Sequence, residues 1–256
     1  MAAGSLTVVG TGIRLAHLTP EARAAILGAE KLLYLVADPV TAAWLRQRRP
    51  DSRSLQDLYR EGVHRREIYA AMAAEIVEPA RTGAHVCAAF YGHPGVFVNP
   101  SHEAVADARA DGIPARMLPA VSAEDCLFAD LGIDPGAGFQ SYDATDFLLR
   151  RRTIDLSASL LLWQVALLGR VDYAPTPDTA HLPVLADRLA ELYGPDHEIV
   201  LYEASPYPFA EPVIERLPIV DLPRAAIGGV ATLYVPPGRA PSVDPATAAR
   251  LRIATG

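Results

Sequence analysis

Short apolar runs alternate with stretches of helical spacing along the first 118 residues of the chain. The runs with strand character are Ser5–Val9, Lys31–Val36, His85–Phe90 and Ala115–Leu118. The stretches with helical spacing are Glu21–Ala29, Val40–Arg48, Arg65–Arg81 and Ser101–Ala110. Strands that alternate with helices in this way form a mostly parallel sheet with helices on both of its faces. The first half of the chain is therefore predicted to be an α/β domain.

The rhythm of strands and helices loosens after Leu118-Pro119. Three further strands are predicted at Ser159–Val165, Glu198–Glu203 and Ala226–Val235, with a helix at Val184–Tyr193 and proline-rich loops between them. We expect a second α/β domain here. The predicted limits are residues 1–119 and 120–237, followed by a short tail, 238–256.

The composition excludes several classes of function. Half of the residues are hydrophobic, so a core can form without disulfides or metal. The net charge of -7 and a pI of about 5.5 argue against binding to nucleic acid or to an anionic membrane. The N-terminus lacks the pattern of a signal peptide, and no apolar run is long enough to span a membrane. We expect a cytoplasmic protein in which Cys87 and Cys126 are free, buried thiols.

A glycine pair, Gly10 and Gly12, follows the first predicted strand. Such glycines let a backbone approach a ligand closely, so both are candidate cofactor-binding residues. Asp38 follows the second strand, where a dinucleotide-binding protein places its ribose ligand. However, Leu15 occupies the position of the third glycine of that fingerprint, and the next helix does not begin at once. A nicotinamide enzyme and an ordinary turn both remain alternatives at this point.

The stretch FYGHPGVFVNPSH, residues 90–102, is longer than a plain connector after a buried strand. Open α/β sheets bind ligands at the carboxyl ends of their strands, which is where this stretch begins. Tyr91 offers a phenol, His93 is framed by glycine and proline, and Val96-Phe97-Val98 forms an apolar wall. The alternative is a structured loop whose tyrosine and histidine are only hydrogen-bonded.

A second stretch, LQDLYREGVHRREIY, places Tyr59, Arg65 and Tyr69 close together in the sequence. Arg65 and Tyr69 are four residues apart, so they share one face of the predicted helix. A solvated charged face is the usual meaning of such a run. Two tyrosines that bracket an arginine are less usual, and they favour a catalytic group.

These two stretches resemble motifs of the borosin-type peptide backbone α-N-methyltransferases, which belong to the tetrapyrrole methylase superfamily. Further similar segments are SLTVVGTGI, ARMLPAVSAEDCLFADLGIDP and LLLWQV, so the resemblance runs from about Ser5 to Pro237. Ordinary tetrapyrrole methylases usually carry GxGPGD, whereas this chain has Gly10-Thr11-Gly12-Ile13-Arg14. The resemblance implies two α/β domains of tetrapyrrole-methylase type, with the methyl donor S-adenosylmethionine in the cleft between them and no metal.

The resemblance also implies which residues do the work. The donor, whose product is S-adenosylhomocysteine, is expected to contact Tyr91, His93, Val96, Phe97, Ser122, Ala123, Gln164, Ala204, Ala231 and Thr232. The implied catalytic group is Tyr59, Arg65, Tyr69 and Tyr91. One departure is Gln56, where some members of the family carry another tyrosine.

The chemistry of amide methylation explains these residue types. A backbone amide nitrogen is a poor nucleophile, because its lone pair is delocalised into the carbonyl group. Arg65 can stabilise negative charge on the amide oxygen. We hypothesise that Arg65 also lowers the pKa of Tyr69, so that a Tyr69 phenolate accepts the amide proton. Tyr59 or Tyr91 would then orient the peptide.

The expected substrate is a ribosomally made precursor peptide, supplied as a separate chain to a homodimeric enzyme. A substrate region that continues this chain is the alternative form of supply. Two other functions remain open from the sequence. One is methylation of a tetrapyrrole-like small molecule, which the overall acidity disfavours because such substrates carry carboxylates. The other is a module that binds the donor without turnover.

Overall fold

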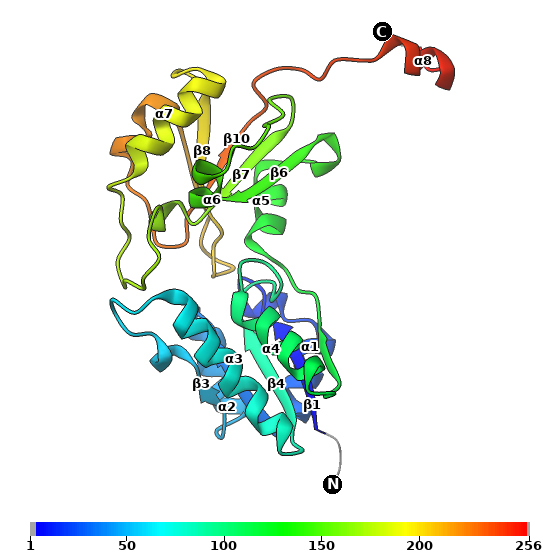
Figure 1. Ribbon diagram of the computed structural model, residues 1–256, viewed down its shortest axis with the longest axis vertical. Helices are drawn as coiled ribbons and strands as arrows, with labels where there is room; N and C mark the ends of the chain where they lie inside the picture. Colours follow the sequence, from blue (N-terminus) through cyan, green and yellow to red (C-terminus); the bar gives the residue numbers. More distant parts are fainter. Residues whose placement is uncertain (1–3, 255–256) are drawn as a thin grey trace. The chain divides into compact units, whose positions relative to one another are not determined.

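The computed structural model describes residues 4–254, which form two compact units (Figure 1). The first unit contains the residues up to Ile133 together with two later segments, Arg170–Thr176 and Ala204–Val213. The second unit contains the remaining residues. The predicted domain limits treat the chain as two continuous blocks, whereas these units interleave in sequence.

The first unit is built on a five-stranded sheet in the order β3-β2-β4-β1-β5. Its strands are β1 (Ser5–Gly10), β2 (Lys31–Leu35), β3 (Arg53–Ser54), β4 (His85–Phe90) and β5 (Ala115–Met117). Neighbouring strands are parallel throughout, and Ser5 of β1 is in register with His85 of β4. The predicted parallel sheet is confirmed, although the two-residue β3 was missed because so short a strand leaves no pattern.

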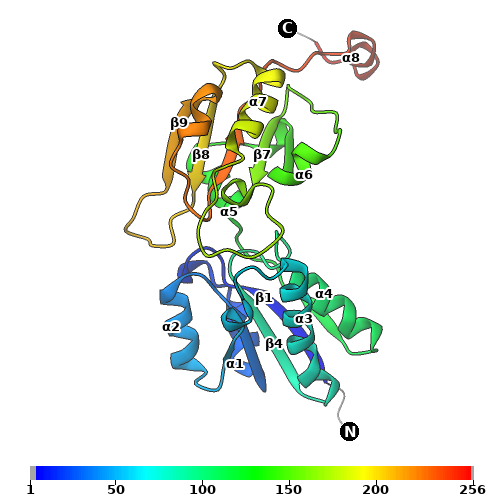
Figure 2. The same cartoon turned by 60° about the vertical axis from the view of Figure 1, so that its left-hand side comes forward.

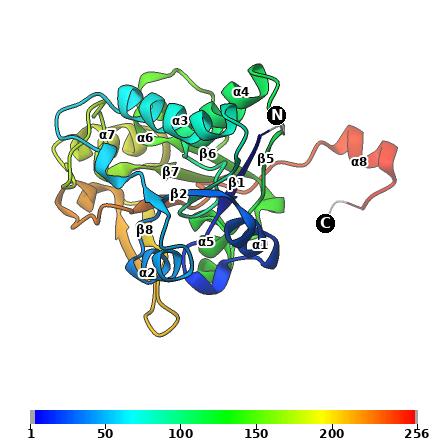
Figure 3. The same cartoon turned by 90° about the horizontal axis from the view of Figure 1, so that it is seen from below.

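Helices cover both faces of this sheet, as Figure 3 shows. They are α1 (Pro20–Gly28), α2 (Pro39–Arg48), α3 (Arg65–Arg81) and α4 (Asn99–Ala110). Successive strand residues point to opposite faces. Val8 therefore packs into the core formed with α3 and α4, while the next residue, Val9, packs into the core formed with α1 and α2.

Side chains that accept backbone hydrogen bonds define where several helices begin. Thr19 Oγ1 accepts a bond from Ala22 N at 3.1 Å at the start of α1. Ser122 and Asp125 form a reciprocal capping box at the start of α5 (Ala123–Leu131). The start of α1 lies one residue before the predicted helical stretch Glu21–Ala29. Asp38, considered as a ribose ligand, instead caps α2 by accepting bonds from the backbone of Val40 and Thr41.

The second unit contains most of a mixed five-stranded sheet in the order β6-β7-β10-β8-β9 (Figure 2). Its strands are β6 (Phe139–Asp143), β7 (Ser159–Trp163), β8 (Glu198–Glu203), β9 (Val213–Pro218) and β10 (Thr232–Val235). β7 is parallel to β6, and β10 is antiparallel to both β7 and β8. Helices α6 (Ala144–Leu149) and α7 (Leu182–Tyr193) pack on the core, and α8 (Pro245–Leu251) follows the last strand.

Two features of the second unit differ from the prediction. The strand expected at Ala226–Val235 is limited to Thr232–Val235, because residues before it, including Gly228-Gly229, form a turn. Strands β6 and β9 were missed, since FQSYD and VIERLP carry too few buried apolar residues to form a strand pattern.

Both units also contain short 3-10 helices. They are η1 (Leu15–His17), η2 (Gln56–Leu58), η3 (Pro135–Ala137), η4 (Val165–Leu167) and η5 (Ile219–Arg224).

None of the helices in the described range 4–254 has the length and apolar character needed to cross a lipid bilayer.

Candidate functional site

A cavity of about 220 Å³ lies in the first unit beside the carboxyl ends of β2 and β4. It is lined by Leu35, Val36, Ala37, Gln56, Tyr59, Tyr69, Phe90, Tyr91, Phe97, Val98 and Pro100. Three of the four predicted catalytic residues, Tyr59, Tyr69 and Tyr91, therefore line one cavity. Gln56, the one departure from the resembled motif noted in the sequence, lines the same cavity as an amide.

The local fold explains how the tyrosines reach this cavity. Tyr91 directly follows β4, and its backbone N–H donates to Leu35 O of the neighbouring β2 at 2.9 Å. Tyr59 follows η2, and Tyr69 lies one turn into α3. His64 caps α3 through Nδ1, which accepts a bond from Arg66 N at 3.1 Å.

The hydroxyl groups of Tyr59 and Tyr69 are hydrogen-bonded to each other. Burial is the main cause that raises the pKa of Tyr59, and this hydrogen bond adds to the increase. The same bond lowers the pKa of Tyr69. Accepting a hydrogen bond stabilises a phenolate, so once Tyr69 is ionised Tyr59 is the donor of this bond. Of the two phenols, Tyr69 is thus the one whose ionisation the pair favours.

Arg65 lowers the pKa of Tyr69, as hypothesised, but the net pKa of Tyr69 in the free protein still lies above its ordinary value. Burial raises the pKa of Tyr69, and the charge of Arg65 together with the Tyr59 hydrogen bond offsets only part of that increase. Arg65 also favours ionisation of Tyr59, against a larger effect of burial. The tyrosine pair is therefore a neutral, hydrogen-bonded unit at neutral pH, with one guanidinium close enough to act on both rings.

The loop after β4 is held by its own hydrogen bonds. His93 Nδ1 accepts a bond from Gly95 N at 3.0 Å, and Val96 N donates to His93 O at 3.1 Å. Ser101 Oγ donates to Val98 O at 2.7 Å. His93 and Val96 are not among the residues that line the tyrosine cavity, whereas Phe97 is. A donor contact for His93 and Val96 stays a prediction.

Backbone strain occurs at two of the predicted donor-binding residues. Within residues 4–254, the non-glycine residues with φ in the left-handed region are Phe97 (55°), Gln164 (58°) and Arg252 (58°). Residues other than glycine rarely adopt this backbone conformation, and such strain is often found where a ligand is held. Phe97 lies in the first unit and Gln164 in the second, directly after β7.

The two glycines after β1 are required by packing within the protein. A Cβ on Gly10 would lie 2.2 Å from the carbonyl oxygen of Gly92, and one on Gly12 would lie 2.2 Å from the Cβ of His17. Gly12 also has a φ of 71°. These contacts account for both glycines without a ligand, so a role in cofactor binding stays a prediction.

The remaining predicted donor-binding residues are distributed over both units. Ser122, Ala123 and Ala204 belong to the first unit, and Ala231 and Thr232 belong to the second. The Ser122 hydroxyl is engaged with Asp125, and Thr232 Oγ1 donates to Tyr202 O at 3.2 Å. Both hydroxyls therefore already have protein partners.

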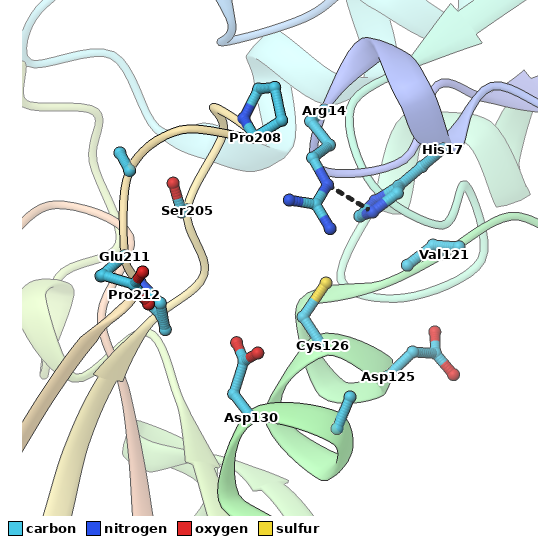
Figure 4. Close-up of a pocket in the computed structure, with 12 residues that line it drawn as sticks. Arg14, His17, Val121, Asp125, Cys126, Asp130, Ser205, Pro208, Glu211 and Pro212 are labelled. Atoms are coloured by element: carbon cyan, nitrogen blue, oxygen red, sulfur yellow. Dashed lines mark hydrogen bonds between the residues drawn. The ribbon is translucent and has the colours of Figure 1, made fainter.

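A second cavity of about 320 Å³ in the first unit was not predicted (Figure 4). Arg14 and His17 of the loop after β1 face α5 and the segment Ser205–Pro212 across it. Arg14 Nε donates to His17 Nε2 at 2.8 Å, and burial, followed by the nearby Arg14 charge, lowers the pKa of His17. No motif in the sequence marks these residues, because the chain brings them together from three distant segments.

Both cysteines are free thiols, as the sequence led us to expect, but only Cys87 is fully buried. Burial raises the pKa of Cys87 to about 12 and that of Cys126 to about 11. Each thiol is thus protonated at neutral pH and is a poor nucleophile or metal ligand. Across residues 4–254, no three His, Cys, Asp or Glu side chains are grouped closely enough to hold a metal ion.

Sequence reasoning missed one residue that contacts the catalytic candidates. The ring of Tyr173 stacks on that of Tyr59, with centroids 4.5 Å apart and an angle of 29° between the planes. Tyr173 lies far along the chain in a loop rich in proline, between β7 and α7. It carries no local pattern, and only the tertiary fold brings it to Tyr59.

Residues 5–218 match the sequence profile of the family described as Tetrapyrrole (Corrin/Porphyrin) Methylases. A protein from Gymnopus fusipes, named a methyltransferase and ribosomally synthesized cyclic peptide gymnopeptides precursor, is 43% identical over 94% of this chain. A type I borosin cyclic peptide precursor with methyltransferase from Coprinopsis marcescibilis is also 43% identical over 94% of this chain. The resemblance noted in the motifs is thus confirmed over most of the sequence. The chain spans 60% of the first relative's length and 63% of the second's.

Solved structures support the same fold. The uroporphyrin-III-C-methyltransferase of Thermus thermophilus superposes with a TM-score of 0.64 at 23% identity, covering 92% of this chain and 93% of that one. A complex of the uroporphyrin-III C-methyltransferase from the same organism with S-adenosylhomocysteine gives a TM-score of 0.61 at 17% identity, with the same coverage. At these identities the comparison establishes the α/β fold with its two sheets. It does not show which ligand this chain binds.

Proposed function

Because the chain belongs to the family of tetrapyrrole (corrin/porphyrin) methylases, we propose that it transfers methyl groups from S-adenosylmethionine to backbone amide nitrogens of a peptide. One observation carries this proposal: Tyr59, Tyr69 and Tyr91 line one cavity, and the charge of Arg65 acts on two of them. The names of the relatives, which join a methyltransferase to a ribosomally synthesized peptide precursor, support the choice of substrate.

The residues present fit a sulfonium donor. Tyr91 and Phe97 line the cavity, and aromatic faces attract a positively charged sulfur. The strained backbone of Phe97 and Gln164 supports donor contacts at both residues. We propose that the donor is held by Tyr91, Phe97 and Gln164, together with His93, Val96, Ser122, Ala123, Ala204, Ala231 and Thr232. When bound, the donor supplies an electrophilic methyl group on a positively charged sulfur.

The side chains of the first unit then have separate roles in activating the amide. Arg65 stabilises the negative charge that develops on the amide oxygen as the nitrogen loses its proton. Tyr69 accepts that proton, and Tyr59 stabilises the developing phenolate by donating its hydrogen bond. A bound sulfonium would add a second positive charge, which would favour ionisation of Tyr69. Tyr91 orients the peptide so that its nitrogen is in line with the methyl group.

The peptide can reach the cavity in two ways. We propose a separate precursor chain that acts as substrate for a homodimeric enzyme in the cytoplasm, where ribosomal peptides are made. The curated relatives instead have methyltransferase and precursor in one protein. Adding a precursor peptide in trans, at increasing concentration, distinguishes the two forms of supply: saturation kinetics support a separate chain, and no turnover at any concentration contradicts it.

Release of S-adenosylhomocysteine tests the proposed reaction against the alternatives. We expect release with a peptide from the precursor region of a relative, no release with a uroporphyrinogen, and losses of about 100-fold or more for Tyr69→Phe and Arg65→Ala. Tyr207→Phe, at a half-exposed tyrosine outside the cavity, is the matched control and should keep full activity. Turnover with the tetrapyrrole alone would favour the small-molecule alternative, and binding of the donor without turnover would favour the silent module.

A further inference from the structure

A short segment from the second half of the chain pairs with the turn that joins Tyr59 to α3. Arg65 N donates to Val171 O at 2.9 Å, Gly62 N donates to Tyr173 O at 3.1 Å, and Tyr173 N donates to Val63 O at 2.9 Å. His64 of this turn and Asp172 of the later segment also form an isolated antiparallel β-bridge. We call residues 170–173 the strap. It belongs to the first unit although β6 and β7 precede it in sequence.

The strap is itself held in shape. Arg170 and Asp172 form an ion pair at 3.1 Å, and both side chains are partly buried. The turn opposite the strap contains Gly62, whose φ of 74° no other residue type adopts easily. Its amide donates to the strap, so the turn and the strap are fixed relative to each other by backbone bonds rather than by surface side chains.

At the end of the strap, Tyr173 stacks on Tyr59 at 4.5 Å. Tyr59 is in contact with Tyr173 by its ring and with Tyr69 by its hydroxyl. An unsupported phenol in a loop would rotate and break its hydrogen bond, because holding one rotamer costs entropy. A stacked ring removes that freedom, and it also excludes water from Tyr59.

From this geometry we propose that Tyr173 is a positioning residue for methyl transfer: its ring holds Tyr59 in the orientation that donates to Tyr69, while the strap's backbone fixes the first turn of α3 and with it Arg65. The proposal rests on the proposed function, since it assigns Tyr59, Arg65 and Tyr69 their catalytic roles. Tyr173 does not line the cavity, so it is not itself a catalytic residue.

The activity of two substitutions at one position tests this role. Tyr173→Phe keeps the stacked ring and should retain kcat within about twofold. Tyr173→Leu keeps apolar bulk but loses the flat ring, and we expect kcat to fall about 10- to 100-fold, the usual effect of slight misplacement of a reacting group. The KM values for peptide and donor should change little. Tyr207→Leu, which removes the stack with Phe209 away from the cavity, is the matched control. Equal kcat for Tyr173→Leu and Tyr173→Phe would overturn the proposal.

A second measurement does not depend on methylation. The alkaline ultraviolet titration of tyrosine, taken as the difference between a protein and its Tyr59→Phe variant, isolates the ionisation of Tyr59. Burial raises the pKa of Tyr59, and Tyr173 contributes to that increase. Tyr173 contributes through the charge of its own phenolate, which both variants lack, so the difference titration should move to lower pH in both, and further in Tyr173→Leu, which also loses the ring stacked on Tyr59.

The two readouts separate the possible failures. If no peptide is methylated but the titration shifts as described, the proposed function fails while the contact between Tyr173 and Tyr59 is supported. If peptide is methylated and neither kcat nor the titration responds to Tyr173→Leu, the positioning role is wrong and the proposed function stands.

Discussion

Tyr69 is subject to opposing influences on its pKa. Burial raises the pKa, while the Arg65 charge and the Tyr59 hydrogen bond lower it, and burial has the larger effect. A base is active only when deprotonated. Under the proposed mechanism, the active phenolate of Tyr69 would therefore have to be favoured by the donor's positive charge during turnover, rather than in the free protein.

The balance at Tyr69 predicts a pH dependence. If the Tyr69 phenolate is the active form, kcat/KM for the donor should rise with pH and level off only above the ordinary tyrosine pKa of about 10. The kcat profile should level off at lower pH, because the sulfonium is present in that complex. Rates measured across this range for the wild type and Tyr69→Phe test the idea. A wild-type rate that does not change with pH would exclude Tyr69 as the base.

The strained residue Gln164 allows a prediction that separates stability from binding. Gln164→Gly should leave the free energy of unfolding unchanged or raise it by about 1 kcal/mol, because glycine adopts the observed φ without strain. If Gln164 contacts the donor, the same change should weaken donor affinity about tenfold, measured by calorimetry.

Arg252→Gly is the control for this pair of measurements. Arg252 has the same φ of 58° but lies after α8, outside the predicted donor site. Arg252→Gly should relieve the same strain without changing donor affinity. Unchanged affinity in Gln164→Gly would remove Gln164 from the donor site.

At the scale of elements, the loop after β1 is determined by close packing. A Cβ at position 10 would meet a backbone oxygen, which cannot move aside as a flexible side chain could. We predict that Gly10→Ala lowers the free energy of unfolding by about 3 kcal/mol, a large overpacking effect, as measured by denaturant titration.

The matched change is Gly28→Ala in α1. A Cβ there has no heavy atom within 4 Å, and the residue is helical, so the substitution should stabilise the protein by up to about 1 kcal/mol. A neutral Gly10→Ala would contradict the packing account and leave a ligand contact as the remaining reason for a glycine at this position.

Asp38 also acts at the scale of an element. Its buried carboxylate accepts bonds from two backbone amides at the start of α2. Asp38→Ala should lower the free energy of unfolding by about 1–2 kcal/mol through loss of the cap. Donor affinity, measured on the same protein, should not change. A specific loss of affinity without loss of stability would revive the ribose-ligand interpretation.

The whole molecule shows which parts of a fold a sequence can reveal. The parallel sheet of the first unit was predictable, because β1, β2 and β4 are largely buried and each contains a run of apolar residues. Strands β6 and β9 were not, since they carry polar and exposed residues. The grouping of Tyr59, Tyr69 and Tyr91 followed from motifs. The direction in which the pKa of Tyr69 is shifted depends on burial, which a sequence does not reveal.

Long-range contacts set the other limit of prediction. Tyr173 reaches Tyr59, and the segment Ser205–Pro212 reaches Arg14, only because later parts of the chain return to the first unit. Neither return has a periodic or compositional signal. Residues that support a site from a distant segment are therefore found in the structure first.

The central claim is that the methyl group goes to a backbone nitrogen of a peptide. The most direct test is fragmentation mass spectrometry of a precursor peptide after incubation with the protein and S-adenosylmethionine carrying an isotope-labelled methyl group. The account predicts labelled methyl groups on backbone amide nitrogens, lost together in Tyr69→Phe and Arg65→Ala. Label found only on side chains, or backbone methylation that persists in both variants, would contradict it.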